Sequence, residues 1–257
     1  MSSYYKCTIA YDGTAYVGWQ SQPGGGSVEQ VLISAFHKAF NKPIAMHGAS
    51  RTDAGVHAVG QVALCITPIE LDPVRLQYAW NNRLPPDVMI QSIDIVDSSF
   101  HPRCNVKQKT YHYYLFERTT LPFSYRYGWV RPYFFDTTAL EDAFKIFVGT
   151  HDFRSFCTGT SYTAGTIRKI DDIRVKRMYD NNRIEITFVA QRFMRYMIRR
   201  LVGAVVTIFT RPHVTIESVK AILMAQNPAH SLPTAPACGL FLSKITYNQK
   251  DLNGLYT

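Results

Sequence analysis

Two hydrophobic periods alternate along the first hundred residues, and each change of period marks a new element. Apolar side chains recur at every second position in residues 4–10, which predicts a strand. They recur at spacings of three and one in residues 28–40, which predicts an amphipathic helix. Ser27 with Gln30 three residues later is typical of a helix start. The same reasoning predicts two strands, a helix and a closing strand over residues 44–49, 61–66, 72–84 and 88–96.

The second half of the chain repeats this order of elements, although it does not repeat the sequence. We expect strand, helix, strand, strand, helix and strand over residues 109–117, 138–148, 167–179, 183–190, 193–209 and 240–247, with an inserted helix at 216–225. The aperiodic residues 98–105 separate two domains, 1–104 and 105–257. This order favours an α+β fold of two ferredoxin-like (RRM-like) βαββαβ halves, with helices on the outer face and antiparallel sheets that form a central cleft.

The net charge of the chain predicts the kind of partner that it binds, because the chain is strongly basic. Lys and Arg number 28 against 19 Asp and Glu, which gives a formal net charge of +9 and a pI near 9.3. A field of this sign attracts polyanions, and bare sheets of this topology stack RNA bases, so we expect an RNA-binding cleft. A membrane surface would attract the same charge, but the longest apolar stretch, residues 201–209, is far shorter than the roughly 20 residues of a spanning helix. No N-terminal signal segment is present, so we expect a soluble protein of the cytoplasm.

Metal-ligating residue types are dispersed along the chain. The five cysteines form no Cys-x-x-Cys pair, and the eight histidines are scattered. His57 lies four residues after Asp53, but no third ligand follows at a suitable spacing. We therefore expect reduced thiols and no bound metal.

One acidic side chain stands in a loop that otherwise lacks acids, between Arg51 and His57. Ala54 and Gly55 follow this residue, Asp53, and such small residues let a backbone or a flat ring approach closely. A carboxylate beside an arginine suits nucleophilic or general-base chemistry on a polyanion. The structural alternative for Asp-Ala-Gly in a loop is a turn or a helix N-cap.

A second segment, residues 107–114, mixes charge with aromatic rings. Strand alternation places Tyr111 and Tyr113 on one face of the predicted strand. Tyrosine rings in strands pack in cores, and a ring that points into a basic cleft offers a stacking platform for a base.

A third segment is the helix predicted from residue 193, which together with the residues just before it carries three arginines on one side. At 100° per residue Arg192, Arg195 and Arg199 share that side, and Arg199 lies where it becomes apolar. A guanidinium that enters an apolar interior needs a carboxylate partner, and Asp53 is a plausible one because acids are scarce in the expected cleft. Arg192 and Arg195 lie further out, where they are solvated or bind phosphates.

Six groups of residues, in order along nearly the whole chain, resemble the motifs of tRNA pseudouridine synthases of the TruA family. They are Tyr11-Asp12-Gly13-Thr14 with Gly18-Trp19-Gln20, Ser50 to His57, Lys109-Thr110-Tyr111, His151-Asp152-Phe153, Phe193 through Met197 to Arg199 with Val202-Gly203, and Thr234-Ala235-Pro236-Ala237 with Gly239-Leu240. Several independent matches in register are far more specific than any single one.

The resemblance implies a tRNA pseudouridine(38–40) synthase, an isomerase that converts uridine to pseudouridine on the 3′ side of the anticodon stem-loop. By the same analogy Asp53 is the catalytic aspartate, Tyr111 packs against the target uracil, and Arg199 pairs with Asp53. The expected tRNA-binding residues are Arg51, Tyr111, Arg192, Arg195 and His57. A two-fold homodimer that binds tRNA is implied as well.

The chemistry of the isomerisation agrees with this assignment. The reaction breaks the bond from ribose C1′ to N1 and makes a bond from C1′ to C5, with no redox change and no added group, so no cofactor is expected. It requires an ionised carboxylate near C1′, an extruded base and exclusion of water. Attack on C1′ and removal of a ribose proton both remain compatible with an aspartate.

Three residues depart from the family pattern. Ser50 stands where glycine or another small residue is common, and Arg195 and Tyr196 stand where many relatives carry histidines. They lie beside the key residues, so they bear on tRNA fit and site preference more than on the reaction.

Two other functions compete with this interpretation. A non-catalytic tRNA-binding or RNA-folding protein would use the same basic, aromatic surfaces, and only product formation separates it from an enzyme. A metal-dependent nuclease would use His57 and Asp152, although His151-Asp152 in a loop is also typical of a local turn.

Overall fold

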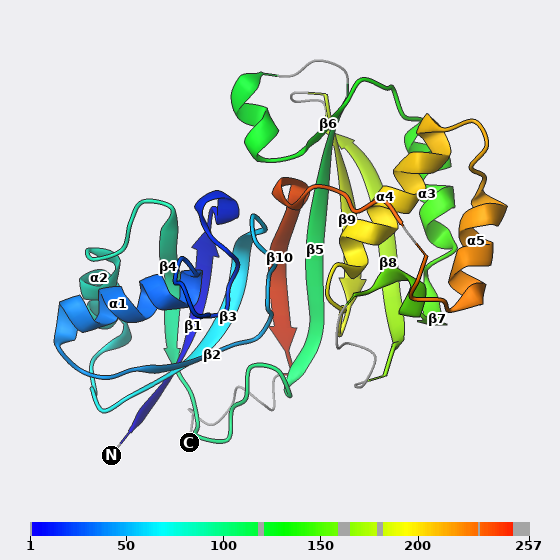
Figure 1. The fold of residues 1–257 in the computed structure, drawn as a ribbon. Helices are drawn as coiled ribbons and strands as arrows, with labels where there is room; N and C mark the ends of the chain where they lie inside the picture. The colour runs from blue at the N-terminus through cyan, green and yellow to red at the C-terminus, as the bar shows by residue number, and fades with distance from the viewer. Residues whose placement is uncertain (1, 118–120, 159–164, 179–181, 231, 249–257) are drawn as a thin grey trace. The chain divides into compact units, whose positions relative to one another are not determined.

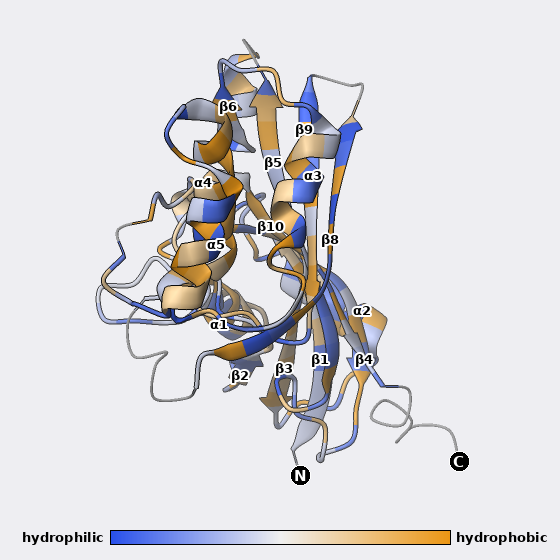
Figure 2. Ribbon diagram, turned by 90° about the vertical axis from the view of Figure 1, so that its right-hand side faces the viewer, coloured by the Kyte–Doolittle hydropathy of each residue, from blue (hydrophilic) through white to orange (hydrophobic). Residues whose placement is uncertain are grey.

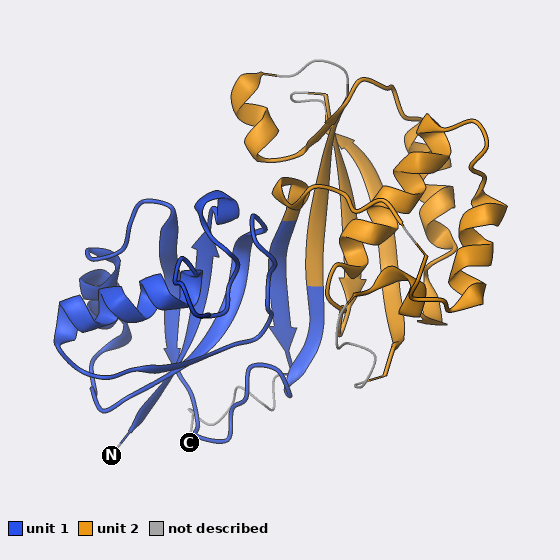
Figure 3. Ribbon diagram, viewed as in Figure 1, with its two compact units in different colours: residues 1–109, 241–257 blue, residues 110–240 orange. Residues whose placement is uncertain are grey.

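The computed structural model describes residues 2–117, 121–158, 165–178, 182–230 and 232–248. The chain forms two compact units, the first made of residues 1–109 and 241–257 and the second of residues 110–240 (Figure 3). No helix in these described ranges is both long and apolar enough to cross a membrane.

The first unit is a sheet with two helices on one face (Figure 1). Its elements are β1 (Ser3–Tyr11), α1 (Val28–Phe40), β2 (Ala45–Gly48), β3 (His57–Thr67), α2 (Pro73–Asn81), β4 (Val88–Ile95) and most of β10 (Leu240–Tyr247). β1 lies between β4 and β3 and is antiparallel to both, β2 is antiparallel to β3, and β10 runs parallel to β3. Tyr5, Cys7 and Ile9 on one side of β1 are buried, which is the alternation that a half-covered sheet requires.

The caps of both helices agree with the sequence prediction. The Ser27 hydroxyl accepts a hydrogen bond from the Gln30 amide at 3.2 Å, and the Asp72 carboxylate accepts from two amides of the first turn of α2. These bonds satisfy amides that lack a partner within the helix. The Trp80 indole of α2 donates to the Leu32 carbonyl of α1 at 3.0 Å, so the two helices are also joined in the core.

The second unit is a sheet in the order β5, β9, β8, β7, with helices packed against it (Figure 1). Its elements are β5 (Val106–Glu117, from residue 110 on), β6 (Trp129–Arg131), α3 (Thr137–Lys145), β7 (Gly149–Asp152), β8 (Ile167–Met178), β9 (Arg183–Ala190), α4 (Met197–Thr210) and α5 (Ile216–Ala225). β8 is antiparallel to β7 and β9, and β6 is parallel to β5. The helices carry both hydrophobic and hydrophilic residues, as coverage of one sheet face requires (Figure 2).

The start of α4 corrects one prediction. We expected a helix from residue 193, but α4 begins at Met197, because Tyr196 has a φ of 62° in the left-handed region. A helix cannot continue through that conformation. Arg192 and Arg195 therefore precede the helix, and the expectation that they share a helical side with Arg199 is wrong.

The place of the last strand also differs from the sequence-based division. Phe241 and Leu242 of β10 pair with His57 and Ala58 of β3, which groups β10 with the first unit. The division into domains 1–104 and 105–257 stays a prediction.

β6 and β7, of three and four residues, are too short to show a period and were not predicted.

Candidate active site

The Asp53 loop connects β2 to β3 and is anchored at its start by a buried glutamine. Gln61 has an exposed fraction of 0%, and its side chain binds Ser50 twice. It accepts from the Ser50 amide at 3.2 Å and donates to the Ser50 carbonyl at 2.6 Å. At the tip, the Val56 amide donates to the Asp53 carbonyl at 3.1 Å, so the loop closes as a tight turn with a half-buried Asp53.

A second segment, residues 11–19, holds the loop on both sides of Asp53. The hydroxyls of Tyr11 and Thr52 lie 2.7 Å apart, and the Trp19 amide donates to the Thr52 carbonyl at 3.2 Å. After the acid, the Gly55 amide donates to the Tyr16 carbonyl at 3.2 Å. The backbone next to Asp53 is therefore fixed by hydrogen bonds from a segment about forty positions earlier in the chain.

One glycine of this segment makes the close approach possible. Gly18 has a φ of 110°, and a Cβ at this position would lie 2.6 Å from the Thr52 carbonyl oxygen. Any other residue would meet both an unfavourable backbone conformation and a backbone clash.

The substitution Gly18→Ala is expected to lower the free energy of unfolding by about 2 kcal/mol or more, because strain at positive φ adds to the clash. It should also lower activity, because Thr52 must move and Asp53 moves with it. Urea unfolding and a pseudouridine assay measure the two effects. Gly165→Ala is the matched control, since Gly165 has a φ of 76° but no atom of the described residues lies within 4 Å of its Cβ position. Equal losses in the two variants would show that the contact with Thr52 is unimportant.

His57 ends the loop and is almost fully buried, with an exposed fraction of 1%. Its ring stacks on Phe241 at 4.5 Å, and Nδ1 lies 3.1 Å both from the Gly13 amide nitrogen and from the Asp12 carboxylate. A nitrogen that accepts from the Gly13 amide cannot donate to Asp12 at the same time, so these two contacts are alternatives. Arg51, at the other end, is exposed.

In the second unit, Tyr111 lies on the buried side of β5 with an exposed fraction of 6%. The ring of Phe193 meets it edge-on, with centroids 5.3 Å apart. Tyr113, two residues on, is fully buried and donates to the Pro236 carbonyl at 2.9 Å, and burial raises the pKa of its phenol well above the usual range. The predicted common face of these two tyrosines is confirmed.

Arg199 lies in the first turn of α4 and is bonded to Ala235 in both directions. Its Nε donates to the Ala235 carbonyl at 2.7 Å, and the Ala235 amide donates to the Arg199 carbonyl at 3.0 Å. One turn later, a Cβ on Gly203 would overlap the Pro233 carbonyl, so only glycine lets the two backbones run this close. These contacts fix the start of α4 and the side chain of half-buried Arg199 against residues 233–235.

Tyr196 lies between two guanidinium groups. Arg195 lies 5.1 Å and Arg199 5.0 Å from its ring centroid, distances typical of cation–π contacts. Arg195 and Arg192 are exposed, whereas Arg199 is half-buried.

His151 and Asp152 are the last two residues of β7, where they pair with Arg168 and Ile167 of β8, and are not part of a loop. The Asp152 carboxylate accepts from the Arg154 amide at 3.0 Å, and His151 Nε2 lies 3.1 Å from the Val148 carbonyl. In the described part of the chain, no group of three or more His, Cys, Asp or Glu residues is placed to hold a metal ion.

A family model described as tRNA pseudouridine synthase matches residues 8–104 and 143–248. The chain belongs to the tRNA pseudouridine synthase family. Proteins named tRNA pseudouridine synthase A are similar over nearly their full length. That of Thermodesulfovibrio yellowstonii is 36% identical over 252 residues, covering 94% of this chain and 98% of the relative. Those of Limosilactobacillus fermentum and Geobacillus kaustophilus are 36% and 34% identical, covering 95% and 98% of this chain and 96% and 97% of the relatives.

This synthase is therefore an isomerase that converts uridine in tRNA to pseudouridine, and the sequence-based identification is confirmed. The matched ranges contain the Asp53 loop and the first turn of α4, whereas Tyr111 lies in the unmatched interval between them. Sequence reasoning from single residues missed Gln61 and the bonds of Tyr11 and Trp19 to Thr52, because contacts between residues far apart in the chain leave no periodic signal.

Proposed function

We propose that Asp53 is the catalytic carboxylate of this synthase, and that it acts on uridines 38, 39 and 40 in the anticodon stem-loop of tRNA. The observation that carries this proposal is the double fixation of the loop. Thr52 and Gly55, on either side of Asp53, are bonded to residues 16–19, while the Asp53 side chain keeps part of its surface exposed. A catalytic group needs this combination, because misplacement by about 1 Å costs roughly 100-fold in rate.

The reaction needs only a carboxylate, a flipped base and a shielded site. The C1′–N1 bond of the uridine breaks, the uracil turns, and C5 bonds to C1′. The C5 proton is then lost and N1 gains a proton, so atoms and charge balance without a cofactor. Asp53 assists at the sugar either by bonding to C1′ or by removing a ribose proton, and both routes need its ionised form.

We further propose that Arg199 pairs with the Asp53 carboxylate and that Tyr111 packs against the target uracil. The Ala235 carbonyl accepts from Nε and so orients the guanidinium plane, which leaves the Nη edge as the part to meet a carboxylate. An opposite charge within about 4–6 Å of a carboxylate favours its ionised form. Phe193 holds the Tyr111 ring edge-on, as a rigid stacking surface requires.

The remaining expected residues differ in exposure. Arg51, Arg192 and Arg195 are exposed and are proposed to bind tRNA phosphates. Buried His57 is proposed to support the substrate site indirectly, by accepting a hydrogen bond from the Gly13 amide.

The finer features of fold and assembly are proposals as well. The first unit has the order β1, α1, β2, β3, α2, β4, with β1 beside β3 and β4, which supports a ferredoxin-like half. We infer that the second unit is also a ferredoxin-like half and that the protein forms a homodimer. We also infer that it acts on its tRNA substrate in the cytoplasm.

The test of this function is the map of product positions. Purified protein is incubated with full-length tRNA transcripts that carry uridine singly at position 38, 39 or 40, and pseudouridine is located by chemical labelling and primer extension. We expect product at these positions and unchanged uridines elsewhere in the same tRNA. Product confined to other positions would overturn the proposed target.

A further inference from the structure

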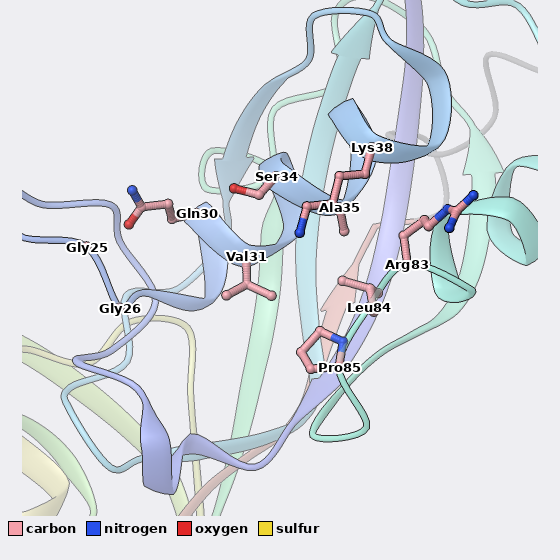
Figure 4. A pocket seen from close by; sticks show the side chains of 10 residues that line it. All are labelled: Gly25, Gly26, Gln30, Val31, Ser34, Ala35, Lys38, Arg83, Leu84 and Pro85. Atoms are coloured by element: carbon pink, nitrogen blue, oxygen red, sulfur yellow. The ribbon is translucent and has the colours of Figure 1, made fainter.

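A groove in the first unit runs along α1, between this helix and residues 83–85 (Figure 4). Its volume is about 600 Å³. Figure 4 shows Gln30, Ser34 and Lys38 following one another along the helix, with Leu84 and Pro85 as the facing wall. The groove belongs entirely to the unit that carries Asp53.

The helix side of the groove carries a row of hydrogen-bond donors beside the apolar side chains of Val31 and Ala35. Gln30, Ser34 and Lys38 are spaced by four residues, so they share one face of α1, and all three are exposed. Arg83 adds a second cation, and the described residues that line the groove include no acid. The single acid of α1, Glu29, is buried and accepts from the Ser21 amide at 2.8 Å. An amide, a hydroxyl and two cations together are typical of a phosphodiester site.

The mouth of the groove is a loop of three glycines with left-handed backbone. Gly24, Gly25 and Gly26 have φ angles of 99°, 78° and 79°, a run that only glycine adopts without strain. A Cβ on Gly25 would lie 3.2 Å from the Gln30 side-chain oxygen. The bare loop therefore leaves the Gln30 end of the donor row open to a ligand.

Hydrogen bonds join this mouth to the Asp53 loop within the same unit. The Val17 amide donates to the Gly26 carbonyl at 2.9 Å, and the Val28 amide of α1 donates to the Gly18 carbonyl at 3.1 Å. The next residue, Trp19, donates to the Thr52 carbonyl beside Asp53. The groove begins close to the reactive loop and extends along α1, about 16 Å from Ser27 to Lys38 at 1.5 Å per residue.

We propose that this groove binds the sugar–phosphate backbone of the tRNA strand that flanks the nucleotide at Asp53. Its location beside the reaction rests on the proposed role of Asp53. The donors of Gln30 and Ser34 and the charges of Lys38 and Arg83 contact phosphates, so the groove recognises the strand without reading its bases.

The test compares two variants with equal changes of net charge. The groove variant is Lys38→Glu with Arg83→Glu, and the control is Arg75→Glu with Lys220→Glu, two exposed cations outside the groove. Both are made in the full chain that also carries Asp53→Asn, and the Kd for an unmodified tRNA transcript is measured at several salt concentrations. Turnover is measured with the same two double variants in a chain that retains Asp53.

We expect the groove variant to bind tRNA about 10-fold more weakly than the control and to lower the salt slope by about 1.5, the value for two lost phosphate contacts. KM should rise with little change in kcat. Equally weakened tRNA binding in both variants, or a loss of kcat with no change in KM, would overturn the proposal that the groove binds tRNA. Because the groove variant and the control are compared in the same Asp53→Asn background, this outcome is independent of whether Asp53 is catalytic. If the groove variant fails to fold, Lys38→Gln with Arg83→Gln removes the charges more gently, and unaltered affinity there would overturn the proposal.

Discussion

Asp53→Asn is expected to lower pseudouridine formation by about 10³-fold or more, because the amide keeps the shape of the side chain but loses the charge that acts at C1′. tRNA affinity should stay nearly unchanged, since the substitution leaves intact the backbone hydrogen bonds of Thr52 and Gly55 that hold the loop. Release of tritium from C5-labelled tRNA measures turnover, and filter binding measures affinity.

The matched control for this prediction is Asp94→Asn. Asp94 lies in the same unit, is half exposed and pairs with Lys6 at 3.0 Å, so the variant makes the same change of net charge away from the loop. It should retain full turnover, because exposed ion pairs contribute little to stability. Normal tritium release by Asp53→Asn, with mass spectrometry showing that the asparagine has not deamidated, would remove Asp53 from the chemistry.

Arg199→Met is expected to lower kcat by about 100-fold or more, because Asp53 loses the cation proposed to keep it ionised. The free energy of unfolding should also fall by about 1–3 kcal/mol, since the Ala235 carbonyl loses its Nε donor. Activity is therefore measured well below the melting temperature of the variant. Arg199→Lys should restore part of the activity, because it keeps the charge but not the planar geometry.

The pH profile separates an electrostatic role of Arg199 from a purely structural one. Loss of a nearby cation favours the protonated carboxyl and raises its pKa. The activity of Arg199→Met should thus be lost at a higher pH than wild-type activity as the solution is acidified. Arg195→Met is the comparison, because Arg195 lies over the same Tyr196 ring but is exposed. It should raise KM without moving the pH profile, and the same shift in both variants would contradict the proposed pairing.

The sequence predicted those parts of the fold whose cause is local. The cap at Ser27 and the periodicity of α1 both act within a few residues, and the structure has them as expected. The predicted start of α4 was wrong, because an apolar period does not show that Tyr196 adopts a left-handed backbone conformation. The ring of Tyr196 contacts Arg195 and Arg199.

The candidate site was predictable as a set of residues but not as a geometry. Asp53 could be singled out by charge and by its small neighbours, and Arg199 by its place where the helix becomes apolar. The family resemblance selected Tyr111 from the aromatic strand and gave each residue its role. The bonds from the Tyr11 hydroxyl and the Trp19 amide to Thr52 connect segments about forty positions apart, so no spacing rule reveals them. Gly18 shows the same limit, because its need for a positive φ and for closeness to Thr52 appears only in three dimensions.

The parallel pairing of β10 with β3 has a consequence for biosynthesis. The strand that completes the first unit is made only after the whole of residues 110–240, and it supplies the Phe241 ring on which His57 stacks. At about 5–20 residues per second, the nascent first unit waits on the order of 10 s on the ribosome without that strand. The unit that carries Asp53 is thus finished only after the whole of residues 110–240 has been translated.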